Sequence, residues 1–299
     1  MNWTLAYLFF GYLLFFLIAV FGVGWWLKGK RRPKSPFKKS TRLLRAPGES
    51  LRLRIQEMDD VFPELMLVAM SGPLLAALLV AWLLIYMKGA EPRSILITFL
   101  SLLILLTLAA AWWLIKKALK RADYYLGYYG ERVVGEILEP LRAEGWQIYH
   151  DVPAQVGKMK FNVDHVAIGP GGIFGIETKA RRKGNALPGR KDHEVLYDGQ
   201  KLMWPWADEQ PPKGVQNAID RAKWLEGWLT SATGESIKVN AVLTLPEWFV
   251  KETGVDPRLR VVASSWLPDV LKARRGVLTD KQIDLLARQL EQRCRDVEY

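Results

Sequence analysis

Three apolar stretches without a single charged residue dominate the first 115 positions and limit what this chain can fold into. They run from Leu5 to Leu27, from Leu67 to Met87 and from Ile95 to Ile115. As an α-helix, each stretch is long enough to cross a hydrocarbon core of about 30 Å. Because a helix without a polar face needs apolar surroundings, the sequence predicts an all-α region of three transmembrane helices.

Two other interpretations of these stretches fit the sequence less well. A cleaved signal peptide would begin with basic residues, whereas this chain begins MNWTLAY and its basic residues follow the first stretch. Buried helices of a soluble protein would keep a polar face, and none of the three stretches has one. We therefore assign residues 1–121 to a membrane anchor, with helices at about 5–27, 67–87 and 95–115.

Basic residues in the connecting segments predict the orientation of the helices. The segment from Lys28 to Arg54 holds eleven basic residues and one acidic residue, Glu49. Positively charged loops remain on the cytoplasmic side, so we expect the N-terminus outside, and the loop 28–66 and everything after residue 116 in the cytoplasm. The sequence thus predicts a multi-pass protein of the bacterial inner membrane. Anionic lipid headgroups are the expected partners of residues 28–54.

The net charge of +11 belongs mostly to this anchor. The first 115 residues hold 13 basic and 6 acidic side chains, and the remainder holds 29 and 25. The soluble part is therefore only weakly basic, and the overall charge does not by itself indicate nucleic-acid binding.

Cysteine and histidine usage excludes two further classes of site. Cys294 is the single cysteine, so the chain has no intramolecular disulfide, which fits a reducing compartment. Zinc would lack thiolate ligands, and His150, His165 and His193 have no HExxH-type spacing. His165 follows Asp164 directly and so points to the opposite face of its strand, where we expect it to pack.

Acidic and basic residues lie on two consecutive predicted strands. Residues 162–179 read NVDHVAIGPGGIFGIETK, two apolar strands joined by a glycine turn. Because side chains alternate along a strand, Glu177 and Lys179 share one face, with Thr178 opposite. The hairpin returns Asp164 to their side, so two carboxylates and an ammonium group are predicted to converge.

This combination suits metal-dependent hydrolysis of a phosphodiester. Carboxylate oxygens hold a hard divalent cation, which lowers the pKa of a bound water, and a lysine can orient that water or offset charge on phosphorus. The alternative is a surface ion pair between Glu177 and Lys179 at the strand end.

Six short motifs follow one another around this hairpin. They are Gly130-Glu131 before the helical pattern ERVVGEILEPL, Val163-Asp164-His165, Ile168-Gly169-Pro170, Gly172-Ile173-Phe174, Ile176-Glu177-Thr178-Lys179 and Val215-Gln216-Asn217. Together they resemble the NERD (nuclease-related) domain, a branch of the PD-(D/E)xK nuclease superfamily, from Gly130 to about Leu290. The resemblance implies an α/β fold with a restriction-endonuclease-like core, a mixed central sheet flanked by helices, in residues 122–299.

The resemblance also implies roles for individual residues. Asp164 and Glu177 would be metal ligands together with the helical acid Glu131, Lys179 the catalytic lysine, and Gln216 a supporting residue on a later helix. Val163 departs from the superfamily, which commonly has proline before this aspartate.

Glu131 and Gln216 each have a plainer interpretation. Glu136 lies five residues after Glu131 and points some 140° away on a helix, so only one of the two can face the hairpin. Glu131 could instead be an exposed acid in the first turn of its helix, favoured by the helix dipole. Gln216 could be a solvated residue near the start of its helix.

Five basic residues follow the catalytic strand and form a candidate contact for a phosphate backbone. We predict nucleic-acid binding by Arg181, Arg182, Lys183, Arg190 and Lys191. An ordinary solvated loop is the alternative. Residues 184–213, rich in glycine and proline, are the least regular segment and form either a substrate-facing flap or an insertion.

Periodicity completes the α/β pattern. It predicts strands at 237–245 and 260–266, a short helix at 268–274 and a terminal amphipathic helix at 278–293 begun by Thr279 or Asp280.

The sequence thus predicts a membrane-anchored nuclease that uses Mg²⁺ or Mn²⁺ on nucleic acid, DNA ahead of RNA, at the cytoplasmic side. The alternative is a non-catalytic membrane-tethered module that retains the fold to bind nucleic acid or a protein. A transporter subunit fits poorly, because the apolar stretches lack ionisable residues.

Overall fold

The computed structural model describes residues 42–86, 91–273 and 276–298, and several positions between 11 and 26. By its contacts the chain divides into Met1–Leu43 with Glu298–Tyr299, and Leu44–Val297. The first unit contains the two-residue strand β1 (Arg42–Leu43), and β10 (Val297–Glu298) ends the described chain. The predicted span at 5–27 lies largely outside the described residues. Its described positions are helical.

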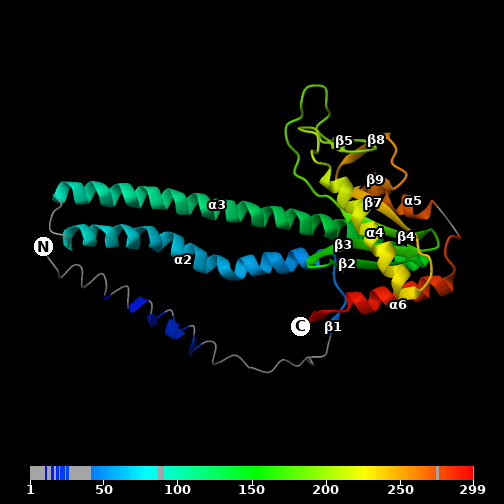
Figure 1. The fold of residues 1–299 in the computed structure, drawn as a ribbon, viewed down its shortest axis with the longest axis horizontal. Helices are drawn as coiled ribbons and strands as arrows, with labels where there is room; N and C mark the ends of the chain where they lie inside the picture. The colour runs from blue at the N-terminus through cyan, green and yellow to red at the C-terminus, as the bar shows by residue number, and fades with distance from the viewer. Residues whose placement is uncertain are drawn as a thin grey trace. The chain divides into compact units, whose positions relative to one another are not determined.

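Two long helices begin the second unit. Helix α2 spans Glu49–Tyr86 and α3 spans Pro92–Leu138, followed by the 3-10 turn η1 (Glu139–Glu144). They lie side by side (Figure 1). Within the part of the chain that the structure describes, they are the two helices long and apolar enough to cross a membrane.

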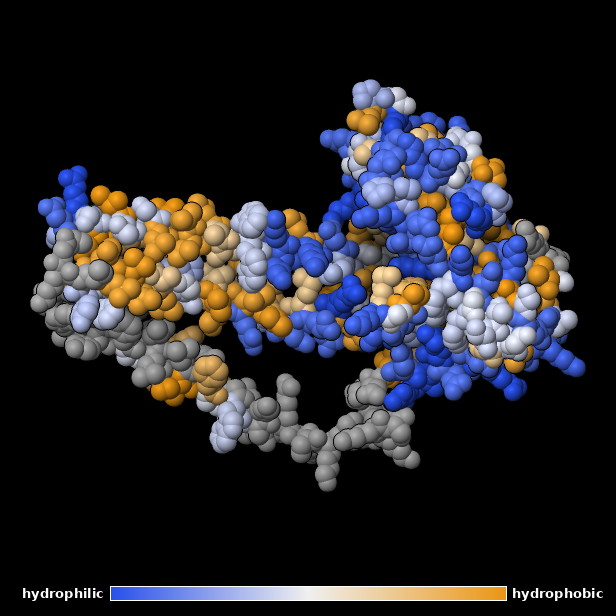
Figure 2. Space-filling view, viewed as in Figure 1, coloured by the Kyte–Doolittle hydropathy of each residue, from blue (hydrophilic) through white to orange (hydrophobic). Residues whose placement is uncertain are grey.

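The apolar parts of these helices have little protein around them. Leu79 on α2 and Leu105 on α3 remain 57% and 64% exposed. Figure 2 shows hydrophobic residues gathered over one end of the pair and hydrophilic residues over the other. Such exposed apolar surface is typical of a membrane-facing helix, which is consistent with membrane anchoring.

Two expectations for this region were wrong. The predicted loop 28–66 is helical from Glu49 onward, because LRLRIQEMDD consists of good helix formers whose charges resemble those of a loop. The predicted helix at Gly130 does not begin there, since α3 continues from Pro92 without a break. The proposed boundary between residues 121 and 122 therefore lies within a helix. Of three predicted spans, the described residues provide two candidates.

The α/β part is built on a five-stranded mixed sheet in the order β2-β3-β4-β7-β9. Strands β2 (Gln147–Val156), β3 (Met159–Gly169) and β4 (Gly172–Thr178) pair antiparallel. Strand β7 (Val239–Leu245) pairs parallel with β4, and β9 (Leu259–Ala263) pairs parallel with β7. Gly169 pairs with Gly172 across the predicted hairpin turn, where Gly172 has φ +120°.

A second sheet has the order β6-β5-β8 and lies partly in the irregular segment 184–213. It comprises β5 (Glu194–Asp198), β6 (Leu202–Met203) and β8 (Phe249–Gly254). These strands and β2 are not evident in the sequence, because they are short or interrupted by polar residues.

Helices cover both faces of the five-stranded sheet (Figure 1). Helix α4 (Lys213–Thr233) and helix α6 (Asp280–Cys294) pack on one face. The end of α3 and helix α5 (Leu267–Lys272), which follows the turn η2 (Ser264–Trp266), pack on the other. Thr279 caps α6 in a capping box with Gln282, as its position predicted. The mixed α/β architecture is therefore confirmed.

Candidate active site

The two strand carboxylates lie side by side at the open end of the β3–β4 hairpin. His165 pairs with Ile176, so the next step along the hairpin sets Asp164 beside Glu177. The backbone N–H of Thr178 donates to Asp164 Oδ2 at 2.8 Å. Both carboxylates are buried. The sequence interpretation that placed them together agrees with this geometry.

Helix α3 brings Glu131 to the same place. Its side chain is buried, and its Oε2 has no hydrogen-bond partner among the described residues. Glu136 is exposed and pairs with Arg132, so it was rightly set aside. Glu131 also lies far from the first turn of its helix, which excludes the interpretation of an exposed acid at a helix start.

Gly130 explains why a glycine precedes this acid. A Cβ on Gly130 would lie 2.6 Å from the Cβ of Ala180, the residue after Lys179. Only a glycine lets α3 pass this close to the end of β4. In the motif Gly130-Glu131, the glycine therefore permits the close approach of α3 to β4, and this approach positions the acid that follows.

We expect Gly130→Val to displace α3 from the strand end. The added methyl groups overlap Ala180, which costs about 1–3 kcal/mol of unfolding free energy and moves Glu131 out of the pocket. Thermal melting measures the loss of stability. Gly227→Val is the matched control, since a Cβ there meets nothing within 4 Å. Equal melting of the two variants would contradict the close-approach role.

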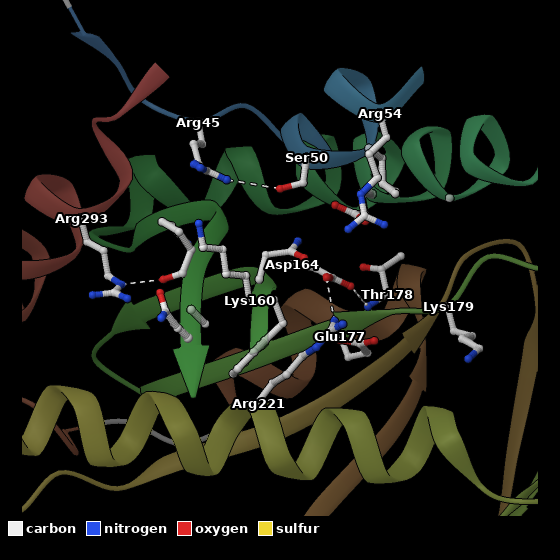
Figure 3. Close-up of a pocket in the computed structure, with 18 of the residues that line it drawn as sticks. Arg45, Ser50, Arg54, Lys160, Asp164, Glu177, Thr178, Lys179, Arg221 and Arg293 are labelled. Atoms are coloured by element: carbon white, nitrogen blue, oxygen red, sulfur yellow. Dashed lines mark hydrogen bonds and ion pairs between the residues drawn. The ribbon is translucent and has the colours of Figure 1, made fainter. Parts of the chain in front are cut away.

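A pocket of about 770 Å³ opens over these three acids. Its walls come from α2, α3, β2, β3, β4, α4 and α6 (Figure 3). Six basic side chains and four acidic ones line it. The basic residues are Arg45, Arg54, Lys160, Lys179, Arg221 and Arg293, and the acidic ones are Glu131, Asp164, Glu177 and Asp296.

Arg221 is the residue at this site that the sequence analysis missed. It rises from α4, and its Nη1 donates to Asp164 Oδ1 at 2.9 Å and also to Glu177 Oε2 (Figure 3). A signal was available: Arg221 is three residues after buried Ala218 and four before buried Leu225, a spacing that predicts the sheet-facing side.

Gln216 does not reach the pocket. Its side chain is exposed, and its Nε2 donates to Asp220 Oδ1 at 2.8 Å, one turn along the same helix. Five residues separate it from Arg221, so the two point some 140° apart. The alternative interpretation of Gln216 as a solvated residue near the helix start agrees with this position.

Lys179 lines the edge of the pocket but is directed away from Glu177 (Figure 3). Its Nζ lies 3.5 Å from Oε1 of Glu209, which is buried and precedes α4. The described residues contain no ion pair between Lys179 and Glu177, so the surface-pair alternative does not apply. The lysine is held near the site by a different acid.

Burial of three acids beside one arginine changes their protonation. Burial, followed by the charges of Asp164, Asp151 and Glu177, raises the pKa of Glu131 to about 10. Burial and the neighbouring Asp164 raise the pKa of Glu177 to about 8, although Arg221 and Lys179 lower it. Burial also raises the pKa of Asp164. One guanidinium does not compensate three carboxylates, so the site favours either bound protons or a further cation.

We expect the metal-free protein to lose stability as the pH rises from about 5 towards 9. Glu131 and Glu177 retain protons in the folded state at pH values where they ionise in the unfolded chain, above about 4.5. The folded state then binds more protons, so a rising pH favours unfolding. Melting temperatures in EDTA across this range measure the effect.

Glu131→Gln provides the control for this pH dependence, because an amide has no proton to release. The variant should show a shallower decline in melting temperature than the parent protein. Since metal ligands have to be deprotonated, affinity for Mn²⁺ should rise over the same pH range. A melting temperature independent of pH would contradict the raised pKa values.

The two histidines of the neighbouring strands pair with each other on the other side of the sheet. Nδ1 of His150 lies 2.8 Å from Nδ1 of His165, and both rings are buried. Burial lowers the pKa of His150 to about 4 and that of His165 as well. The prediction that His165 packs rather than serves as a ligand agrees with this arrangement.

The five basic residues proposed to bind nucleic acid lie outside this pocket and have local partners. Arg181 is 3.5 Å from Glu209, and Lys183 lies over the ring of Trp248. The other three pair with acids, Arg182 with Asp123, Arg190 with Asp208 and Lys191 with Glu194. Local acids thus offset much of the charge on this loop, as expected for the solvated-loop alternative.

The carboxylates of the pocket suit a hard divalent cation, provided that Arg221 moves away from them. Among the described residues, no group of three or more His, Cys, Asp or Glu side chains is already arranged to hold a metal ion. Arg221 occupies the space between Asp164 and Glu177. Its side chain is 21% exposed and lines the open pocket, so it has room to move. Carboxylate oxygens, including the unpartnered Oε2 of Glu131, would then be available.

The mixed sheet, with buried acids at the end of a central hairpin, forms an α/β domain. Residues 126–246 match the family model described as the nuclease-related domain, NERD. The chain therefore carries a nuclease-related domain, as the sequence motifs predicted. The comparisons with curated proteins and with solved structures returned no match. The matched region begins within α3 and ends after β7, so α2 and α6 contribute to the pocket from outside it.

Proposed function

We propose that this protein is a membrane-anchored nuclease that hydrolyses phosphodiester bonds with the help of a divalent metal ion. The observation that supports this most directly is the convergence of Glu131, Asp164 and Glu177 in one pocket, with an unpartnered buried oxygen on Glu131. The match of residues 126–246 to the nuclease-related domain supports the same reaction class.

Each side chain has a defined part in this proposal. Asp164, Glu177 and Glu131 would hold Mg²⁺ or Mn²⁺, which supplies an activated water and charge stabilisation on the phosphoryl group. Lys179 leaves Glu209 and orients the attacking water. Arg221 leaves the carboxylates and pairs with the phosphate, whose geometry a guanidinium matches.

The membrane location is part of the proposal. Helices α2 and α3 are the candidate spans. By the distribution of positive charge, the nuclease-related domain would face the cytoplasm of a bacterial cell, with the N-terminus outside. Of the predicted lipid-binding residues 28–54, those before Arg45 would contact anionic headgroups, because Arg45 and Arg54 line the pocket. The proposed substrate is nucleic acid, with DNA ahead of RNA.

A second function is favoured by the state of the site itself. Arg221 bridges the two strand carboxylates, and Glu209 holds Lys179, so each of these charged groups already has a partner. A site closed in this way would suit a membrane-tethered module that binds nucleic acid or a protein without cleaving it. Metal binding separates the two functions, because only the nuclease requires it.

One experiment tests both. The full chain, purified in detergent, is incubated with linear, circular and single-stranded DNA and with RNA, in Mg²⁺, Mn²⁺ or EDTA. The nuclease proposal expects products in metal and none in EDTA. Isothermal titration with Mn²⁺ on the same sample measures binding. The absence of both products and metal binding would favour the non-catalytic module.

A further inference from the structure

The basic side chains of the pocket differ in whether they already have partners. Arg45 pairs with Asp151 and Asp296, and Arg221 pairs with Asp164 and Glu177. Arg293 donates to the carbonyl oxygen of Pro153. These contacts hold the three side chains in place, and the charges of Arg45 and Arg221 are not available without a rearrangement.

Three cations in the wall have no acidic partner among the described residues, namely Arg54 on α2, Lys160 on β3 and Arg293 on α6. Of these, Arg293 is held by the carbonyl oxygen of Pro153 and by two indole rings, whereas the side chains of Arg54 and Lys160 have no hydrogen bond or ion pair in the described part of the chain. Both are exposed, and both line the pocket (Figure 3). The guanidinium carbon of Arg54 lies 5.9 Å from the centroid of the Tyr124 ring. Exposed, unpaired cations beside a buried acidic site are suited to a polyanion whose scissile phosphate lies deeper in the pocket.

One aromatic side chain also lines the pocket, and it follows Lys160 along β3, so it leaves the strand on the opposite face. Phe161 is half-buried and lines the pocket, and its ring meets Trp224 edge to face with centroids 5.6 Å apart. Trp224 in turn stacks on Trp228, and Arg293 lies over both indole rings. Packing on one side therefore fixes the phenyl ring. A rigid ring and unpaired cations lining the same pocket are the combination that binds unstacked bases and their backbone.

We propose that this wall binds a single strand of nucleic acid, with phosphates at Arg54 and Lys160 and a base against Phe161. This inference rests on the proposed function in so far as both place nucleic acid in the pocket. It assigns substrate binding to α2, which lies outside the matched nuclease-related region, and to the start of β3. Duplex bases are already stacked on each other, so a ring in the wall favours an unpaired strand.

Binding is measured separately from cleavage, by fluorescence anisotropy of labelled oligonucleotides with the full chain in detergent and EDTA. Arg54→Gln and Lys160→Gln should each weaken binding of a single strand about tenfold. Each should also reduce the salt dependence of log K by about 0.7, the value for one phosphate contact to a single strand. Lys281→Gln removes the same charge from exposed α6 surface outside the pocket and should bind like the parent protein.

The role of Phe161 has its own control. Phe161→Leu keeps an apolar side chain against Trp224 but removes the ring face, and should weaken binding of an ordinary strand about tenfold while leaving an abasic strand unaffected. Melting temperatures equal to that of the parent protein show that the variants fold.

Two results would overturn the inference: affinities of the Arg54 and Lys160 variants equal to that of Lys281→Gln, or tighter binding of duplex than of single strand. A protein that binds as described but cleaves nothing in Mg²⁺ or Mn²⁺ would retain this inference and refute the nuclease proposal. Cleavage by the parent protein, together with unchanged affinity in the Arg54 and Lys160 variants, would support the nuclease proposal and refute this inference.

Discussion

Asp164→Asn should abolish cleavage while leaving the fold intact. The asparagine keeps an oxygen that can accept the N–H of Thr178, so the end of the hairpin is preserved. It removes the negative charge that the metal ion requires, and we expect a loss in rate on the order of 10³-fold. Glu177→Gln should have a similar effect, because the two carboxylates are neighbours on the paired strands. Product formation in Mn²⁺ is the measurement.

The matched control is Glu136→Gln. Glu136 is exposed on the same helix as Glu131 and pairs with Arg132 at the surface, so its neutralisation should leave the rate unchanged. Melting temperature and Mn²⁺ titration accompany each assay. If Asp164→Asn and Glu177→Gln both cleave at the parental rate, the pocket is not the nuclease site.

Arg221→Met should destabilise the metal-free protein and increase its affinity for metal. Methionine retains the apolar part of the arginine side chain but leaves Asp164 and Glu177 buried without a counterion. Breaking a buried ion pair in this way costs about 3–5 kcal/mol, and the partial exposure of Arg221 favours the lower figure. Mn²⁺ would no longer compete with the guanidinium, so it should bind more tightly and restore much of the lost stability.

Melting of the variant with and without Mn²⁺ measures both effects. Arg132→Met serves as the control, since it breaks an exposed pair with Glu136 and should change stability by less than about 1 kcal/mol, with no dependence on metal. A variant at Arg221 as stable as the parent protein, with unchanged affinity for Mn²⁺, would show that this arginine does not compensate the acids.

The sequence was most informative where neighbouring residues determine the structure. Alternation along a strand and a glycine turn are local properties, and they were sufficient to place Asp164 and Glu177 on one face of a hairpin. The cap at Thr279 is equally local. Helical geometry separated Glu131 from Glu136, and the exposed position of Glu136 agrees with that choice.

The errors arose where distant parts of the chain meet. Nothing near Gly130 in the sequence indicates that it approaches Ala180. Its helix was predicted to begin at Gly130, whereas α3 begins at Pro92, 38 residues earlier. Arg221 was overlooked because a basic residue within a helix resembles a solvated one until the acids opposite it are known. Lys179 pairs with Glu209, whereas local spacing had indicated Glu177 as its partner. Wherever charges combine over long sequence separations, the local pattern supplied the residues but not their partners.

Helix α3 continues from its apolar part to Glu131 without a proline or a break. From Ile115 at the end of the apolar stretch to Glu131 is sixteen residues, or roughly 24 Å at the rise of an α-helix. If α3 crosses the bilayer as proposed, the length of this segment determines the distance of the acids from the lipid surface. Inserting or deleting a helical turn would change that distance by about 5.4 Å. The distance in turn determines how near the membrane a nucleic-acid strand must lie to enter the pocket.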